Sequence, residues 1–282
     1  MNWLIIDNLI IEAIKEDVPQ NDITTEFIIR DESICSVDLI AKETGIIAGL
    51  PVFERVFKIL GEVNIEFFKH DGDVVNVGQC IAKLCGKTKH ILTGERIALN
   101  YLQRMSGIAT LTKTYVDKLE GTGVKILDTR KTTPNMRIFE KYAVKIGGGC
   151  NHRYNLSDSV LIKENHISAA GGIKAAVNII RQNVSFVKKI EVEVETLEQI
   201  YEALEVGVDI IMLDNMDVES MKKSVEIIDK KTLVEASGNV TLDNILTVAS
   251  SGVDYISVGA LTHSYKVLDL SMKNLVNRPI LS

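Results

Sequence analysis

Short apolar runs separated by helix-like stretches recur along the chain from about residue 124. The runs are VKILD, AVKIGG, SVLIK, IEVEVE, VDIIMLD, TLVEAS and VDYISVG, starting at residues 124, 143, 159, 190, 208, 232 and 253. Strands buried on both faces of a parallel sheet read as continuous apolar runs, and helices connect them. The pattern therefore predicts a βα architecture with seven parallel strands.

Residues 1–108 show a different pattern. An amphipathic N-terminal helix leads into strand-like alternation and then into the glycine-punctuated stretch KHDGDVVNVGQCIAKLCG. This indicates a separate α+β domain. The DGDxVxxG pattern is typical of hairpins in lipoyl and biotinyl carrier domains, but no lysine here stands at a tight hairpin tip beside Met or Asp. A carrier function is therefore disfavoured.

The ends of the apolar runs carry the candidate chemistry. They finish at Asp128, Gly147, Lys163, Glu193 with Glu195, Asp214, Glu235 with Ser237, and Gly259. In βα architectures functional residues collect at the C-terminal ends of the strands, where a barrel makes them face one cavity. We therefore expect these positions to surround a common site.

Cations and carboxylates are both present in this set. The cations are Arg130, Lys131, Arg153 and Lys163, together with His152, and His166 is a further candidate. Several cations in one pocket suit an anion with more than one charge, and arginine suits a carboxylate or phosphate. Glu193 and Asp214 on adjacent strands suit Mg²⁺, which takes few protein ligands and leaves positions for water and phosphate. A diphosphate would satisfy both groups.

The last two strands predict a phosphate site. EASGNV (235–240) and SVGALTHS (257–264) place small residues and backbone N–H groups at the strand ends. Barrels commonly bind a phosphate at this position. The chain shows no Ser/His/Asp or Cys/His arrangement for a covalent nucleophile, so we expect an electrostatic site.

The stretch TGERIALNYLQRMSG predicts a helix with one apolar stripe. Ile91, Ala98, Leu102 and Met105 share a face at the 3.6-residue period, and Arg96 points away from it. Arg96 is then either a solvated surface arginine or a residue that reaches into a neighbouring subunit. Helix geometry does not separate these two interpretations.

Composition narrows the functional class. The 282 residues carry a formal charge of −6, which argues against general nucleic-acid binding. No apolar stretch is long enough for a membrane span, and the N-terminus lacks the basic start of a signal peptide. The four cysteines form no CxxC pair, so neither a zinc site nor a disulfide framework is expected. We expect a cytoplasmic protein with no membrane or nucleic-acid partner.

These residues also carry a family resemblance. The chain resembles quinolinate phosphoribosyltransferase, also called nicotinate-nucleotide pyrophosphorylase (carboxylating), over nearly its whole length. The resemblance lies in DITTEF, GERIALNYLQRMSGIAT, DTRKTTPNMR, GGGCNHR, LIKENH, EVEVETLEQ, IMLDNM, EASGNV and SVGALTHS. It implies Mg²⁺-dependent transfer of phosphoribosyl from phosphoribosyl pyrophosphate to quinolinate, giving nicotinate mononucleotide, CO₂ and pyrophosphate in NAD biosynthesis. The enzyme class implied is a decarboxylating pentosyltransferase.

The resemblance implies a fold and a domain organisation. An α/β class is expected, with an N-terminal α/β sandwich domain at 1–108 and an incomplete seven-stranded α/β barrel at 109–264. The C-terminal tail, 265–282, would pack back on the first domain. A homodimer is implied, in which Arg96 enters the partner subunit's active site.

The resemblance also implies roles for single residues. Quinolinate would be bound by Arg130, Arg153, His152 and Lys163, and Lys131 would face the pyrophosphate. Glu193 and Asp214 would orient the ribose hydroxyls and hold the metal. The 5′-phosphate would be bound by Ser237, Gly238, Gly259 and His263. The loop 130–137 is a candidate for closure over the substrate.

Three alternatives stay open from the sequence. A molybdenum-associated family shares the DTRKTTP motif, and nicotinate phosphoribosyltransferases use a related barrel on a monocarboxylate. The full set of cations, with the Asn-His-Arg of GGGCNHR, favours quinolinate over both. A scaffold that only binds a phosphorylated ligand would lack a cation or a carboxylate of this set, and none is missing.

Overall fold

A computed structural model describes residues 1–61 and 63–278 of the chain. The chain divides into two compact units that interleave along the sequence. The first unit comprises residues 1–113, 133–148 and 265–282, and the second comprises 114–132 and 149–264. Residues 109–113 and 133–148 thus group with the first unit, whereas the boundaries implied by the resemblance include them in the barrel.

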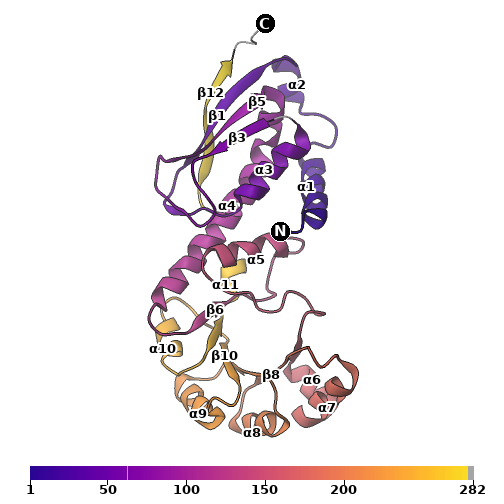
Figure 1. Ribbon diagram of the computed structural model, residues 1–282, viewed down its shortest axis with the longest axis vertical. Coiled ribbons are helices and arrows are strands. Elements are labelled where there is room, and N and C mark those ends of the chain that lie inside the picture. Colours follow the sequence, from indigo (N-terminus) through magenta and orange to yellow (C-terminus); the bar gives the residue numbers. More distant parts are fainter. Residues whose placement is uncertain (62, 279–282) are drawn as a thin grey trace. The chain divides into compact units, whose positions relative to one another are not determined.

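The first unit is built on an antiparallel sheet of four strands. Its order is β12 (Leu270–Arg278), β1 (Ile34–Ala41), β5 (Cys80–Lys87) and β3 (Val63–Phe67). The strand β12 comes from the C-terminal tail and lies beside β1, with Met272 opposite Leu39 (Figure 1). Residues 279–282 of the predicted tail lie outside the described residues. A small pair, β2 (Gly45–Ile46) and β4 (Val74–Val75), completes the strands described here.

Among the described residues, five helices contribute to the first unit. They are α1 (Trp3–Asp17), α2 (Ile23–Ile28), α3 (Leu50–Leu60), α4 (Thr88–Lys118) and α5 (Arg137–Ile146). In α4 the predicted stripe is confirmed, since Ile91, Ala98, Leu102 and Met105 are fully buried. Burial of these side chains removes apolar surface from water and stabilises the helix within the unit. Arg96 is exposed on α4, as its helical position predicted.

The prediction of a strand at AVKIGG (143–148) is wrong. These residues form the end of α5 and its C-cap, Gly147. The buried residues of α5 include Phe139, Glu140, Ala143 and Val144, so they recur at helical spacing rather than at every second position. The short apolar run belongs to a longer amphipathic helix, which the run alone did not reveal.

The second unit contains a parallel sheet of six strands. Its order is β6 (Lys125–Leu127), β11 (Tyr255–Ser257), β10 (Leu233–Ser237), β9 (Ile210–Asp214), β8 (Ile190–Val194) and β7 (Val160–Ile162). Six of the seven predicted strands are therefore present. A single parallel bridge from Leu127 to Cys150 lies on the outer side of β6.

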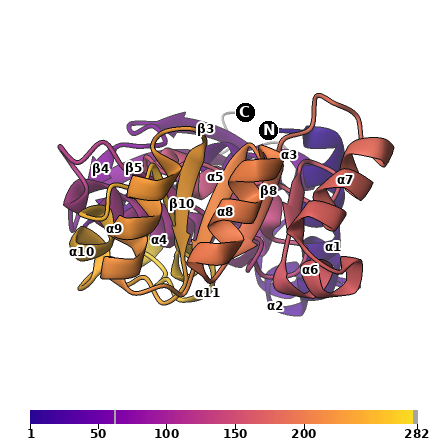
Figure 2. The same cartoon turned by 90° about the horizontal axis from the view of Figure 1, so that it is seen from below.

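Helices connect these strands in the expected βα manner. They are α6 (Glu164–Ala170), α7 (Ile173–Asn183), α8 (Leu197–Val206), α9 (Val218–Ile228), α10 (Ile245–Ala249) and α11 (Ala260–His263). Figure 2 shows α8 and α9 lying over the strands β8 and β10. Thr196 precedes α8 in a capping box. Its side-chain oxygen accepts the backbone N–H of Gln199, and its own backbone N–H donates to Gln199 Oε1.

Strand register places the acidic side chains on one face of the sheet. Glu193 of β8 is paired with Met212 of β9, which is paired with Glu235 of β10. Asp214 follows Met212 by two residues and is paired with Ser237. Residues in register, and residues two apart on a strand, point to the same face. All these side chains therefore project toward the same cavity.

No helix in the described ranges has both the length and the apolar composition that a membrane crossing requires.

Candidate active site

A cavity of about 650 Å³ lies at the C-terminal ends of the strands of the second unit. Its lining includes nine of the residues predicted for the site: Arg130, Lys131, His152, Arg153, Lys163, Glu193, Asp214, Ser237 and Gly238. These residues come from six separate strand ends and loops. The fold therefore gathers most of the predicted cations and carboxylates around one space.

Two arginines, Arg130 and Arg153, line this cavity, and their positive charges repel each other. Burial lowers the pKa of Arg153, and the positive charge of Arg130 lowers it further. The Nε atom of Arg130 is buried and has no hydrogen-bond partner within the described ranges. Arg153 donates from Nη1 to the carbonyl of Ser159 at 3.2 Å. Two like charges held together with an unused donor form a site that an anion would stabilise.

Lys163 and Glu193 form an ion pair at the rim of the cavity. The Lys163 Nζ atom lies 2.7 Å from Glu193 Oε2, and the two side chains are 49% and 13% exposed. The pair holds the Lys163 ammonium group, at the end of β7, beside the Glu193 carboxylate, near the end of β8. Because the pair is partly exposed, it contributes little to stability, on the order of 1 kcal/mol or less.

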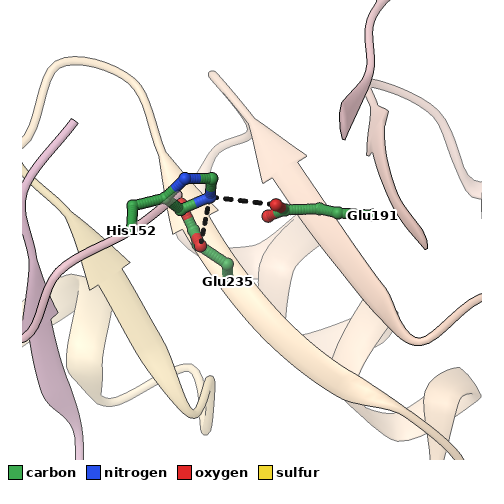
Figure 3. Close-up of side chains that lie close together, drawn as sticks. All are labelled: His152, Glu191 and Glu235. Carbon is green, nitrogen blue, oxygen red and sulfur yellow. Dashed lines mark ion pairs between the residues drawn. The ribbon is translucent and has the colours of Figure 1, made fainter. Parts of the chain in front are cut away.

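His152, Glu191 and Glu235 form a buried cluster, and His152 and Glu235 also line the cavity (Figure 3). The His152 Nε2 atom is 2.9 Å from Glu191 Oε2 and 3.6 Å from Glu235 Oε2. Burial and, to a smaller extent, the charge of Glu191 raise the pKa of Glu235, whereas His152 lowers it. The net pKa is about 8. The raised pKa favours the protonated form of the Glu235 carboxyl.

The segment that carries His152 is anchored by a buried aspartate. Asp128 is fully buried at the end of β6, and its carboxylate accepts the backbone N–H of His152 at 3.0 Å. It also accepts a hydrogen bond from the side chain of Asn151. Asp128 thus holds the loop after the glycines in place, a structural role that its position at a strand end did not reveal.

The loops after β9 and β10 are tied together by two asparagines. Asn215 and Asn239 have positive φ angles of 53° and 51°, and Asn239 Nδ2 donates to Asn215 Oδ1 at 3.2 Å. Gly238 between them has a φ of 97°. A Cβ atom at Gly238 would lie 2.1 Å from Asn215 Oδ1. The close approach and the left-handed backbone both require glycine here.

Backbone hydrogen bonds fix the position of Lys131, and its side chain packs against Gly259. Its N–H donates to Thr129 Oγ1 at 3.0 Å, and its carbonyl accepts the Thr262 hydroxyl at 2.9 Å. A Cβ atom at Gly259 would lie 3.0 Å from His263 Nε2 and 3.1 Å from Lys131 Cδ. Gly259 and His263 are therefore adjacent to Lys131, although neither lines the cavity itself.

His166 was a further candidate cation of the site. His166 does not line this cavity, and its Nδ1 atom accepts the backbone N–H of Lys163 at 3.0 Å. It caps the first turn of α6. Arg96 belongs to the first unit, where its side chain is exposed on α4.

Glu235 was predicted as a strand-end position and lines the cavity, whereas Glu191, Asn215 and Asn239 were not selected from the sequence. Glu191 shares the period-2 face of Glu193, so the alternation held a signal for it. The two asparagines each follow a strand end, a position where asparagine readily adopts a positive φ.

Two carboxylate groups could hold a metal. Glu193 and Asp214 line the cavity from adjacent strands and offer only oxygen atoms, which fits Mg²⁺. The cluster of His152, Glu191 and Glu235 also has ligand atoms within 4.8 Å of one another, but its imidazole nitrogen suits a transition metal better. The predicted pair is thus the better fit for magnesium.

Comparison with known proteins agrees with this arrangement. Residues 22–106 match the family model described as quinolinate phosphoribosyl transferase, N-terminal domain, and residues 108–273 match the C-terminal domain model of that family. A Bacillus subtilis protein named probable nicotinate-nucleotide pyrophosphorylase [carboxylating] is 43% identical, covering 96% of this chain and 94% of the relative.

A plant relative and a solved structure extend the likeness. Quinolinate phosphoribosyltransferase [decarboxylating] 2, mitochondrial, from Nicotiana glauca is 42% identical, covering 93% of this chain and 80% of that protein. The crystal structure of NadC from Streptococcus pyogenes has a TM-score of 0.95 at 44% identity and covers 99% of both chains. From the family models and these full-length relatives, the chain belongs to the quinolinate phosphoribosyltransferase family.

Proposed function

We propose that the protein transfers a phosphoribosyl group from phosphoribosyl pyrophosphate to quinolinate and releases CO₂ and pyrophosphate. The product, nicotinate mononucleotide, enters NAD biosynthesis. The observation that carries this proposal is the pair Arg130 and Arg153, whose charges repel each other in a cavity that also holds Glu193 and Asp214. A dianionic substrate relieves that repulsion, and the carboxylates serve the ribose and the metal.

In this proposal the cavity is divided between the two substrates. Quinolinate lies against Arg130, Arg153, His152 and Lys163, so that its two carboxylates are matched by several cations. The pyrophosphate faces Lys131. The 5′-phosphate lies at the strand-end loops of Ser237, Gly238, Gly259 and His263. The helices after these loops, α10 and α11, have only five and four residues, so backbone N–H groups of the loops would provide most of the binding.

The reaction needs charge stabilisation rather than a nucleophilic side chain. Cleavage of the bond between ribose C1 and pyrophosphate sends the electron pair to the leaving group, whose charge Lys131 neutralises. The developing positive charge on the ribose lies beside Glu193 and Asp214. Mg²⁺, held by these two carboxylates, would supply further neutralisation of the diphosphate.

Decarboxylation follows from the product of this transfer. The pyridine nitrogen donates its electron pair to ribose C1 and becomes positively charged. The bond to the 2-carboxylate then breaks, its electrons are stabilised by the cationic ring, and a proton replaces CO₂ at that carbon. Ribosylation therefore precedes loss of CO₂.

The homodimer and the cytoplasmic location belong to the same proposal. Arg96 is exposed on α4, which leaves its guanidinium available to a partner subunit's cavity. Closure of residues 130–137 over the substrate also stays a prediction, and protease susceptibility with and without ligand would test it.

The first test is release of CO₂ from carboxyl-labelled quinolinate by the purified protein. We expect release only when phosphoribosyl pyrophosphate and Mg²⁺ are both present, and no nucleotide from nicotinate in a parallel assay. Turnover of nicotinate without turnover of quinolinate would move the protein to the monocarboxylate enzymes. No turnover of either would favour a scaffold that only binds ligand.

A further inference from the structure

The buried cluster of His152, Glu191 and Glu235 is not explained by substrate contacts alone. Glu191 and Glu235 are only 3% and 2% exposed, and they come from β8 and β10, which are separated by β9. In barrels, alternate strands contribute side chains to the same interior layer, and here two such positions hold acids instead of apolar residues. Figure 3 shows both carboxylates directed at the His152 ring.

Packing does not account for two acids at these positions. A buried carboxylate loses its hydration, and this loss destabilises the fold unless a partner compensates for it. Glu191 Oε1 and Glu235 Oε1 accept no hydrogen bond in the part of the chain that the structure covers. An apolar layer would be more stable, so the acids have a role connected with the one group that both approach, His152 Nε2.

The two glutamates differ in their relation to the ring. Glu191 Oε2 is within hydrogen-bond distance of Nε2, whereas Glu235 Oε2 is 3.6 Å away. Glu191 Oε2 is therefore the nearer acceptor for the Nε2–H of His152, and the Glu235 carboxyl is the second group beside that nitrogen.

His152 is also fixed at its backbone. Its N–H is held by Asp128, and its side chain lines the cavity beside Arg130 and Arg153. With its backbone and Nε2 both held, the ring has a single orientation toward the space where the anion binds. A fixed donor loses less entropy on binding than a mobile one.

We propose that Glu191 and Glu235 are positioning residues that hold the His152 imidazole by Nε2 in the orientation needed to bind quinolinate. The proposal rests on the proposed function, since it assigns His152 to that substrate. It adds an internal layer of residues that act through His152. Their loss should weaken quinolinate binding and leave phosphoribosyl pyrophosphate binding unchanged.

The test is steady-state kinetics on Glu191→Gln and Glu235→Gln, which keep the side-chain shape. For Glu191→Gln we expect the KM for quinolinate to rise about tenfold or more, the scale of one charge-assisted hydrogen bond. The KM for phosphoribosyl pyrophosphate should stay within about threefold of wild type. Glu195→Gln is the matched control, because Glu195 follows on the same chain segment but is exposed. Equal changes in both KM values would overturn the proposal.

A double-mutant cycle separates positioning from a general structural effect. In a His152→Ala background, Glu191→Gln should cause no further rise in the KM for quinolinate, because the group it positions is gone. Fully additive effects of the two substitutions would contradict the proposal.

A spectroscopic measurement tests the same idea without turnover. In ¹⁵N-labelled protein, the ring signals of His152 are assigned by their loss in His152→Ala. We expect the Nε2 signal to shift in Glu191→Gln and to stay unchanged in Glu195→Gln. An unchanged Nε2 signal in Glu191→Gln would overturn the positioning role. If wild-type protein released no CO₂ from quinolinate, the proposed function would fail, while this spectrum would still report on the contact.

Discussion

At the scale of single residues, Arg130 shows how two like charges in one cavity favour an anionic ligand. Its charge, added to burial, lowers the pKa of Arg153, and its buried Nε atom lacks a partner among the described residues. We expect Arg130→Ala to lower kcat/KM for quinolinate at least ~100-fold, because a charge-assisted contact is lost. The midpoint temperature of thermal unfolding should be unchanged or slightly higher, because the repulsion between Arg130 and Arg153 is removed.

The matched control for this substitution is Arg181→Ala. Arg181 lies on α7 and donates to the Gly207 carbonyl, away from the lining of the cavity. It should leave kcat/KM unchanged. Near wild-type turnover in Arg130→Ala would contradict the assigned role of Arg130.

Glu235 makes a residue-scale prediction about pH. Its pKa is about 8 in the folded protein against 4.5 ordinarily, so the folded state binds this proton more tightly. Rising pH across that window therefore lowers the free energy of unfolding. The glutamine of Glu235→Gln has no proton to lose in this pH range. The free energy of unfolding of the variant should therefore fall less with rising pH than that of the wild type, and the difference should be on the order of a few kcal/mol. Urea unfolding at about pH 5 and about pH 8.5 measures the difference. A variant whose pH dependence matches wild type would contradict the buried, protonated state of Glu235.

At the scale of elements, glycines in two strand-end loops have different roles. Gly238 is required by the backbone conformation, whereas Gly259 leaves room for the Lys131 and His263 side chains. Gly238 has a φ of 97°, and a Cβ atom there would also lie 2.9 Å from the backbone nitrogen of Asn215. We expect Gly238→Ala to lower the free energy of unfolding by about 1–3 kcal/mol and to impair turnover. Chemical denaturation with parallel kinetics would show both effects.

Gly259→Ala is the contrasting substitution. Gly259 has a φ of −65°, which alanine adopts readily, and the added methyl group meets only the His263 and Lys131 side chains. We expect stability to change by less than about 1 kcal/mol. The KM for phosphoribosyl pyrophosphate should rise, because Lys131 is displaced. Unaltered kinetics would argue against a phosphate site at this loop.

At the scale of the whole molecule, the proposed exchange of Arg96 between subunits has a direct test. Arg96→Ala and Arg130→Ala should each be inactive alone. After mixing and reassembly, one site in each mixed dimer combines an intact cavity with an intact Arg96. Activity should return to roughly one quarter of wild type for random pairing of equal amounts. Mixtures that stay inactive, although mixed dimers form, would place Arg96 in the site of its own subunit.

Much of this site could be predicted because polar residues interrupt apolar runs at strand ends. Lys163, Glu193 and Asp214 each close such a run, and the structure brings all three to the same cavity. The prediction failed where local sequence was ambiguous. Ala143 and Val144 read as part of a strand, but they face the core from α5, because only the longer pattern distinguishes the two periods.

The sequence by itself determined the parallel βα rhythm, the family resemblance and the types of charge placed at the strand ends. These depend on local order and residue chemistry, which a linear pattern contains. Only the tertiary structure decided that Glu191 and Glu235 from non-adjacent strands meet at His152, and that Arg130 acts on Arg153. Alternation shows which face a side chain takes, but its depth and its neighbours depend on how distant strands pack.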